Sequence, residues 1–346
     1  MVRFVQYGVG KMSKFTIQYA VEKGYKLVGA FDVDESKIGR SVSDVIGEPN
    51  VSIKIQNINA FKEFLIVNKP DIVIVTTMSL IKDVYDALQI CAECGVNAIT
   101  ICEEAFYPQN SNPKIFDRLD KLAKENRCVI TGTGYQDVFW GNLISVIAGA
   151  THKIDLIKGQ SSYNVEDYGI ALAKAHGVGL TAQEFEDEVA SVDNISNSER
   201  QSLINRGDFL PSYMWNVNGW LASKLGLEIL QQNQKCVPIF ADEDMQCESL
   251  GLNIAKGKVR GMSAVVTSTT KEGVIIESQC IGKLYTKDEC DINDWSVVGV
   301  PDTRVVISRP STVELTCATC INRIKDVLAS KDFGYITTDK FEMAKF

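Results

Sequence analysis

Short apolar runs alternate with amphipathic segments of helical periodicity over the first 134 residues. The strand-like runs are VRFVQY (2–7), KLVGAFDVD (26–34), DIVIVTTMS (71–79), NAITIC (97–102) and CVITGTG (128–134). The helical segments are residues 12–23, 81–95 and 114–127. Strands that alternate with helices form a parallel sheet covered on both faces, so this part of the sequence predicts a Rossmann-type, doubly wound α/β domain.

The pattern changes after Gly134. A helix is expected at residues 141–150, and the segments that follow are rich in strands and carry turn signals such as Lys271-Glu272-Gly273. These features predict a second domain of α+β type built on a largely antiparallel sheet. We expect a first domain at 1–134, a second at 135–302, and a C-terminal segment at 303–346 that packs back on the first domain.

Composition excludes several classes of protein. The 346 residues include 36 Lys+Arg and 44 Asp+Glu, for a net charge of −8, which argues against nucleic acid or an anionic membrane as the main partner. No run approaches the roughly 20 apolar residues of a membrane span. The N-terminal segment lacks the features of a signal peptide, so we expect a cytoplasmic protein with reduced thiols.

Metal binding is not expected. The two histidines, His152 and His176, are too few for a histidine-rich site. Two C-x-x-C pairs, Cys91/Cys94 and Cys317/Cys320, would together suffice for a four-thiolate zinc site. Each pair, however, lies on one face of an amphipathic helical segment, and buried thiols are the favoured interpretation.

The segment Gly8-Val9-Gly10-Lys11-Met12-Ser13 follows the first strand and opens the first helix. Gly8 permits a tight turn, and Gly10 lets a pyrophosphate approach the backbone at the positive end of the helix. Ser13 replaces the third glycine of the dinucleotide fingerprint and is small enough for close packing. The residues predicted to contact a dinucleotide are Gly8, Val9, Gly10, Lys11 and Met12.

Asp32 ends the second strand, where an acidic residue binds the hydroxyls of the adenosine ribose. Because Asp32 would repel a 2′-phosphate, NAD is the favoured cofactor, while Lys37 and Arg40 leave NADP as an alternative. Thr76 and Thr77 follow the third strand, at the edge of the sheet where ligands bind, and we expect both to contact the cofactor.

Glu103 and Glu104 follow the strand NAITIC at the same edge of the sheet. Adjacent side chains on an extended chain point in opposite directions, so at most one carboxylate should face a bound nicotinamide. A partly desolvated carboxylate with a raised pKa could move the protons that accompany oxidation of an amine. Glu104 is the first choice for this catalytic residue and Glu103 the second.

Seven segments together resemble the NAD(P)-dependent amine dehydrogenase family that includes 2,4-diaminopentanoate dehydrogenase. They are QYGVGKMSK (6–14), VGAFDVD (28–34), TTMS (76–79), TICEEAFYP (100–108), TGTG (131–134), HGVGLTAQEF (176–185) and CINRIKDVL (320–328). The resemblance implies a dihydrodipicolinate-reductase-like N-terminal domain, reversible oxidative deamination without a metal, and a catalytic glutamate that corresponds to Glu104. It also implies a substrate pocket with aromatic side chains at Trp140 and Tyr168.

The stretch after TGTG departs from the pattern of family members that act on simple amines. It reads Tyr135-Gln136-Asp137-Val138-Phe139-Trp140, which favours a diamino acid such as 2,4-diaminopentanoate as the substrate. Asp137 or Glu166 would bind its second ammonium group, and Arg200 or Arg206 its carboxylate. The residues predicted to bind substrate are Gln136, Asp137, Trp140, Tyr168 and His176.

Two points stay open at this stage. For His176, a structural or loop role is slightly favoured over a place in the substrate pocket. The alternative functions are a dihydrodipicolinate-reductase-like imine reductase and a non-catalytic NAD-binding sensor, because a fold alone does not establish a function. The expected partners are a small-molecule amine substrate and a second copy of the chain in a homodimer.

Overall fold

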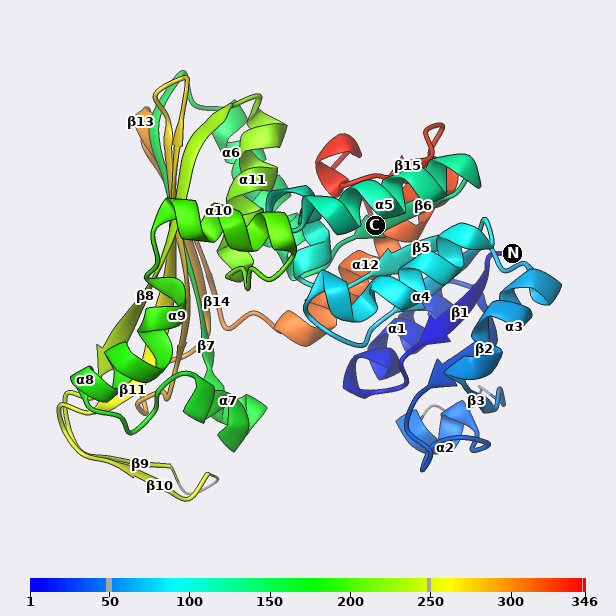
Figure 1. Ribbon diagram of the computed structural model, residues 1–346, viewed down its shortest axis with the longest axis horizontal. Coiled ribbons are helices and arrows are strands. Elements are labelled where there is room, and N and C mark those ends of the chain that lie inside the picture. Colours follow the sequence, from blue (N-terminus) through cyan, green and yellow to red (C-terminus); the bar gives the residue numbers. More distant parts are fainter. Residues whose placement is uncertain (48–51, 248–249, 344) are drawn as a thin grey trace. The chain divides into compact units, whose positions relative to one another are not determined.

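The computed structural model describes residues 1–47, 52–247, 250–343 and 345–346, and it divides the chain into two compact units (Figure 1). Unit 1 comprises residues 1–142 and 311–346, and unit 2 comprises residues 143–310. The chain passes from one unit to the other after residues 142 and 310. Each of these positions lies eight residues after the boundary expected from the sequence, at 134 and 302. Within the described ranges, no helix is long and apolar enough to cross a membrane.

The sheet of unit 1 has seven strands in the described part of the chain: β1 (Arg3–Tyr7), β2 (Lys26–Asp32), β3 (Ile55–Asn57), β4 (Ile72–Val75), β5 (Asn97–Thr100), β6 (Val129–Gly132) and β15 (Gly334–Tyr335). All are parallel, in the order β15-β6-β5-β4-β1-β2-β3. The winding reverses at β1, which has β2 on one side and β4 on the other. The predicted doubly wound sheet is therefore confirmed, and ligands of such sheets bind beyond the carboxyl ends of the strands at this reversal.

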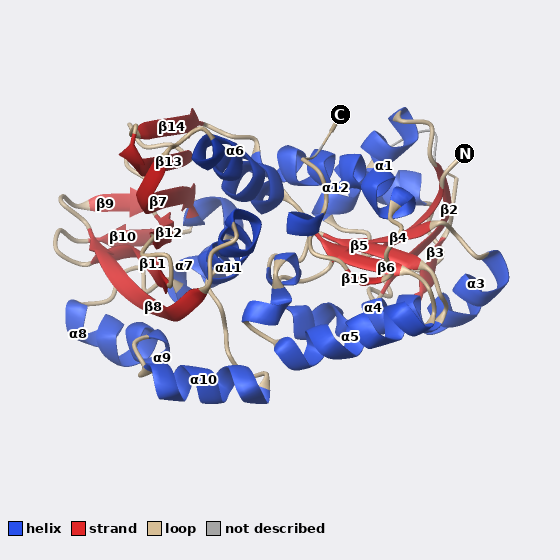
Figure 2. Ribbon diagram, turned by 90° about the horizontal axis from the view of Figure 1, so that it is seen from above, coloured by secondary structure: helices blue, strands red, loops and turns tan. Residues whose placement is uncertain are grey.

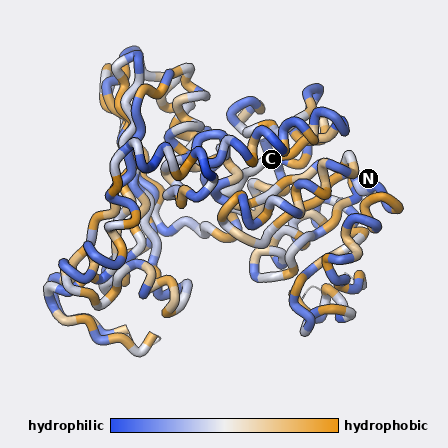
Figure 3. Tube along the Cα trace, in the orientation of Figure 1, coloured by the Kyte–Doolittle hydropathy of each residue, from blue (hydrophilic) through white to orange (hydrophobic). Residues whose placement is uncertain are grey.

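Helices cover both faces of this sheet (Figure 2). One face packs against α1 (Lys11–Glu22), α2 (Val42–Ile46) and α12 (Thr312–Ala329), and the other against α3 (Phe61–Asn68), α4 (Ile81–Glu93) and α5 (Pro113–Glu125). The helices are amphipathic, and in Figure 3 hydrophobic and hydrophilic colours alternate along α5. Apolar side chains from the two faces of the sheet thus fill two separate core layers.

Unit 2 contains a six-stranded sheet in its described residues, in the order β14-β13-β7-β12-β11-β8. Its strands are β7 (Lys153–Asn164), β8 (Ile229–Phe240), β11 (Val259–Thr270), β12 (Ile275–Lys283), β13 (Ile292–Val300) and β14 (Thr303–Ser308). Only the β7–β12 pair among these is parallel, so the predicted α+β unit on a largely antiparallel sheet is confirmed. A separate two-stranded sheet joins β9 (Met245–Cys247) to β10 (Leu252–Ile254).

The helices of unit 2 include α6 (Leu143–Gly149) and α11 (Tyr213–Leu225), which pack against the six-stranded sheet. The buried Asn218 of α11 fixes this packing, because its amide donates to Ser268 and to the Ile276 carbonyl and accepts from the Ser278 hydroxyl. The other α-helices among the described residues of unit 2 are α7 (Ile170–Ala175), α8 (Ala182–Phe185), α9 (Ser191–Asp193) and α10 (Asn197–Arg206).

A charged cluster joins three segments of unit 2. Both oxygens of Glu289 accept hydrogen bonds from the Arg260 guanidinium, at 2.7 and 3.1 Å, and the carboxylate also pairs with Lys283. The Thr286 N–H donates to the same carboxylate at 2.8 Å. Although burial opposes ionisation, these donors lower the pKa of Glu289 to about 2.

Glu289 should therefore make stability depend on pH. Its ionised form stabilises the fold fully above its ordinary pKa of 4.5, and this contribution is lost as pH falls from 4.5 towards about 2. We expect Glu289→Gln to lower Tm at pH 7, and the difference from the wild type to shrink as the pH approaches 3. A Tm difference that stays constant over this range would contradict the assignment.

Candidate functional site

The loop between β1 and α1 lies at the point where the winding of the parallel sheet reverses. Gly8 has a φ of +87°, and its N–H donates to the Phe31 carbonyl of β2 at 2.8 Å. A Cβ at Gly8 would lie 2.6 Å from the Thr77 side chain and 3.3 Å from the Thr76 carbonyl oxygen. The close approach of the β4 end therefore requires glycine here, for both conformation and space.

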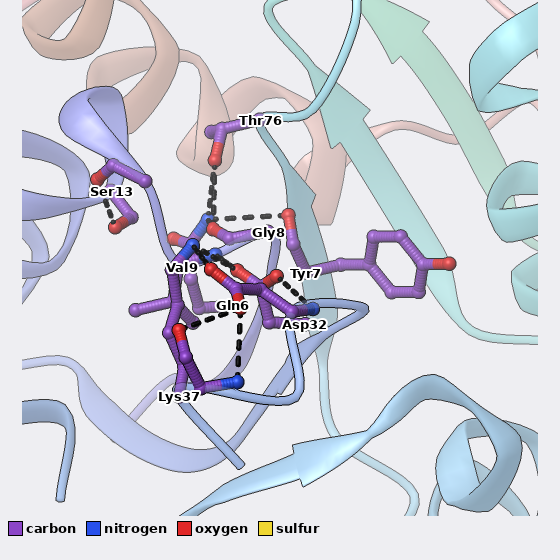
Figure 4. Close-up of polar contacts among 11 residues, drawn as sticks. Gln6, Tyr7, Gly8, Val9, Ser13, Asp32, Lys37 and Thr76 are labelled. Carbon is purple, nitrogen blue, oxygen red and sulfur yellow. Dashed lines mark hydrogen bonds and ion pairs between the residues drawn. The ribbon is translucent and has the colours of Figure 1, made fainter. Parts of the chain in front are cut away.

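The buried Gln6 side chain holds this loop through hydrogen bonds (Figure 4). The Gln6 amide nitrogen donates to the Gly8 carbonyl at 3.0 Å and to the Thr76 hydroxyl at 2.8 Å, while its oxygen accepts from the Thr16 hydroxyl at 2.9 Å. Thr76 in turn donates to the Gly8 carbonyl at 3.1 Å. The Thr76 hydroxyl thus holds the loop in place, and the exposed Thr77 is the member of the predicted pair with a freely accessible side chain.

Asp32, at the end of β2, holds the same loop by a hydrogen bond. Its Oδ2 accepts the Val9 N–H at 2.7 Å and its Oδ1 accepts the Asp34 N–H at 2.9 Å, while Lys37 Nζ lies 3.1 Å from Oδ2. Burial alone would raise the pKa of the Asp32 carboxyl, but these three donors hold that pKa below its usual range. Asp32 is therefore an anion at neutral pH, fixed at the end of β2.

The start of α1 suits an anionic ligand. Its first turn, which is described in full, contains Lys11 and Lys14 and no acidic residue, and no side chain caps its N-terminus. Among the described residues, no atom lies within 4 Å of the position that a Cβ on Gly10 would occupy. Exposed backbone N–H groups beside such open space can bind a pyrophosphate. The loop, helix start and Asp32 thus fit a dinucleotide, whereas the Val9 side chain is buried in the core.

We expect Gly8→Ala to raise the Kd for NAD more than about tenfold and to destabilise the protein by about 1–3 kcal/mol, because of its positive φ and its contact with Thr77. Titration calorimetry and chemical unfolding measure the two effects. Gly24→Ala is the matched control, since Gly24 has a φ of +78° and a Cβ there meets no described atom within 4 Å. Equal loss of NAD affinity in both variants would contradict a role for Gly8 in the site.

The Glu104 side chain is hydrogen-bonded to the N-terminus of α4. Leu80 occupies the N-cap position and cannot accept a hydrogen bond through its side chain, so Glu104 Oε2 accepts the Ile81 N–H at 2.8 Å instead. Glu104 Oε1 accepts the Ser111 hydroxyl at 2.7 Å, and the side chain is only 5% exposed. Burial raises the pKa of Glu104, against these two hydrogen bonds. The carboxylate predicted first as catalytic thus caps a helix.

Glu103 begins the short helical turn Glu104–Phe106 and is half-buried. Burial raises the pKa of its carboxyl, and a hydrogen bond from the Ser79 side chain opposes this. Gly132 of β6 lets the turn pack closely, because a Cβ there would lie 2.1 Å from the Ala105 carbonyl oxygen. Glu103 is the more exposed residue of the pair, at the ligand-binding edge of the sheet.

The segment after TGTG forms the helical turn Gln136–Asn142, and its polar side chains are engaged inside unit 1. The fully buried Asp137 forms a bidentate ion pair with Arg323 of α12, with distances of 2.7 and 2.9 Å. Gln136 is also buried and donates to the Thr133 carbonyl at 3.0 Å. Trp140 is 7% exposed and packs edge-on against Tyr135. Asp137 therefore binds a protein cation rather than presenting its carboxylate to a substrate.

Tyr168 and His176 both contact the Tyr163 ring in unit 2. The Tyr163 hydroxyl is 2.6 Å from His176 Nε2, and His176 Nδ1 is 2.9 Å from the Leu172 carbonyl. Because a carbonyl only accepts, Nδ1 carries the proton and Nε2 accepts from Tyr163. Burial lowers the pKa of His176, so this pair is neutral at pH 7. Tyr168 packs edge-on against Tyr163 and is 51% exposed.

The cysteines are all free thiols. Cys91 belongs to the core on one face of the sheet and Cys320 to the core on the other, so the two C-x-x-C pairs do not come together. The described residues contain no group of three or more His, Cys, Asp or Glu side chains that could hold a metal ion.

Comparison with known proteins adds two relatives that span the chain, although no family model matches it. A 2,4-diaminopentanoate dehydrogenase from Acetoanaerobium sticklandii is 24% identical over 342 residues, which cover 95% of this chain and 90% of the relative. The solved structure of an amine dehydrogenase from Mycobacterium smegmatis is 33% identical, with a TM-score of 0.83 over 100% of this chain and 97% of that one.

A more distant structure shares the fold. The WlbA dehydrogenase from Bordetella pertussis, solved in complex with NADH and UDP-GlcNAcA, is 12% identical, with a TM-score of 0.53 over 96% of this chain and 77% of that one.

Proposed function

This chain belongs to the amine dehydrogenase family that includes 2,4-diaminopentanoate dehydrogenase, and we propose that it is an NAD(P)-dependent oxidoreductase that deaminates a primary amine. The observation that carries this proposal is the position of Glu103. Glu103 is half-buried, its carboxyl has a pKa raised by burial, and it lies at the same edge of the parallel sheet as the Gly8 loop. A general base and a dinucleotide-binding loop at one sheet edge are what amine oxidation requires.

Residues of unit 1 would hold the coenzyme. Gly8, Gly10 and the first turn of α1 would bind its pyrophosphate, and Asp32 its adenosine ribose. When bound, the nicotinamide ring accepts a hydride from the carbon that bears the amine.

Glu103 would manage the protons. It takes a proton from the substrate ammonium, because only the neutral amine can donate its lone pair as hydride leaves the adjacent carbon. Glu103 passes this proton to solvent and can then receive a proton from the water that adds to the iminium carbon. It returns that proton to the nitrogen, and the carbon–nitrogen bond breaks to release ammonia, which takes up the proton lost by the new carbonyl oxygen. In sum, a substrate ammonium, oxidised coenzyme and water yield a carbonyl compound, ammonium, reduced coenzyme and one proton.

A diamino acid is the more specific form of this proposal, supported by the name of the relative that is 24% identical. Two of the charged groups suggested for its recognition are already engaged. Asp137 pairs with Arg323, and the 1% exposed Arg200 donates to Asn233 and to the Asp193 and Gln234 carbonyls. Glu166, the other carboxylate suggested for the second ammonium, is half-buried in unit 2 and accepts a 3.5 Å hydrogen bond from the Asn164 amide.

A primary amine without a carboxylate is the second candidate. The engagement of Asp137 and Arg200 favours it, as does the 33% identity to a structure named as an amine dehydrogenase.

A paired substrate assay tests the proposal. The protein is incubated with NAD and either 2,4-diaminopentanoate or 2-aminopentane, which share a five-carbon chain, and reduced nicotinamide is followed by its absorbance. Turnover of either compound supports an amine dehydrogenase, and the ratio of kcat/KM values identifies the substrate class. NAD binding without turnover across these and related amines would overturn the proposal and favour the sensor alternative.

A further inference from the structure

We propose that Lys37 allows the adenosine end of the coenzyme site to accept NADP as well as NAD. Lys37 would stay paired with Asp32 when NAD is bound, and would pair with the 2′-phosphate when NADP is bound. This inference rests on the proposed function and names a residue that sets the coenzyme range of the same site.

The first argument is the position of the Lys37 ammonium group (Figure 4). Nζ lies 3.1 Å from Asp32 Oδ2 and 3.7 Å from Asp34 Oδ2. The Lys37 side chain is 24% exposed, whereas that of Asp32 is 8% exposed, so Lys37 is the more solvent-accessible partner of the pair. A phosphate placed beside Asp32 would therefore have a solvent-accessible ammonium group next to it.

The second argument is that Asp32 cannot move away from an approaching phosphate. The Val9 and Asp34 N–H groups hold its two oxygens, one on each. An unpaired carboxylate fixed in this way would repel the 2′-phosphate of NADP. Lys37 supplies the positive charge that offsets this repulsion, so the usual reason for selecting NAD is weakened here.

The third argument is that Lys37 can exchange partners at little cost. Its backbone is fixed by a 2.9 Å hydrogen bond from its N–H to the Asp34 carbonyl, but the ammonium is at the end of a flexible four-carbon chain. Its contacts with Asp32 and Asp34 are single-point contacts, and the Asp34 side chain is 46% exposed, so water screens that pair. Contact with a doubly charged phosphate would replace them.

Arg40, the other cation on this loop, provides the control. Its guanidinium donates to the Asp44 carbonyl at 3.4 Å at an exposed position. Arg40→Met and Lys37→Met remove the same charge from the same loop, so a difference between them reports on position rather than on net charge.

The test is equilibrium binding, with no substrate present. The Kd values of NAD and NADP are measured by titration calorimetry at constant ionic strength, for the wild type, Lys37→Met and Arg40→Met. We expect the wild type to bind NADP within tenfold of NAD. Lys37→Met should raise the Kd ratio of NADP to NAD at least tenfold, the size expected for one charge-assisted contact, and Arg40→Met should leave it within threefold.

A wild-type Kd ratio of NADP to NAD of ten or more would overturn the inference. So would a Lys37→Met variant in which this Kd ratio rises less than tenfold, or rises no more than it does in Arg40→Met. Absence of binding of either coenzyme would overturn this inference and the proposed function together. Failure of the proposed function alone would look different, since both coenzymes would bind while no amine was oxidised.

Discussion

Replacing Glu103 with glutamine is expected to lower kcat for amine oxidation about 10²–10⁴-fold at neutral pH, while the Kd for NAD stays within about twofold. Glutamine keeps the size and hydrogen-bonding capacity of the side chain but cannot take a proton from the substrate ammonium. Burial raises the pKa of Glu103 above its ordinary value of 4.5. The fraction of Glu103 in its ionised, basic form therefore still increases as the pH rises beyond 4.5. The wild-type kcat should therefore rise with pH on its acidic limb, and the variant should lack this limb. Steady-state kinetics over pH and NAD titration measure these effects.

Glu104→Gln is the matched variant, since it makes the same change one residue away. Glu104 accepts hydrogen bonds from Ile81 and Ser111 inside the protein, so its replacement should cost about 1–3 kcal/mol of stability and leave the pH profile of kcat unchanged. If Glu104→Gln abolished turnover in a folded protein while Glu103→Gln kept more than a tenth of the wild-type kcat, the roles of the two carboxylates would be reversed.

The fold followed from local sequence patterns because the parallel sheet is buried on both faces. The runs at β1, β2, β4, β5 and β6 are apolar enough to be recognised, and Gly24 and Gly95 mark the ends of α1 and α4. Unit 1 closes with β15, only two residues long, which pairs with β6 from the other end of the chain. Such a pairing depends on long-range contacts and has no local signal.

The site was predictable where it depends on the backbone and not where it depends on side-chain partners. The Gly8 loop and Asp32 are defined by their positions on strands, and the structure brings them together. Which glutamate remains accessible depends on the N-terminus of α4, which needs an acceptor that Leu80 cannot supply. Gln6 was missed, although a glutamine inside an apolar strand is itself a signal of a buried polar contact.

Replacing Asp137 with asparagine is expected to destabilise the protein by about 3–5 kcal/mol, the usual cost of removing one member of a buried ion pair. Asp137 and Arg323 are both fully buried, and Thr133 and Asn142 complete the hydrogen bonds to the carboxylate, at 2.9 and 2.7 Å. The variant leaves a buried guanidinium whose remaining carboxylate partner is Asp326. The free energy of unfolding in urea, compared with that of the wild type, measures the loss.

This variant also separates a structural role for Asp137 from the role in substrate binding that its sequence context suggested. A structural role predicts a large loss of stability and an unchanged ratio of KM values for 2,4-diaminopentanoate and 2-aminopentane at a temperature where the variant is folded. The double variant Asp137→Leu/Arg323→Met, which removes both charges, should recover much of the stability, because the cost arises from the unpaired cation. An unchanged free energy of unfolding, together with a selective rise in KM for the diamino acid, would instead mean that Asp137 binds the substrate.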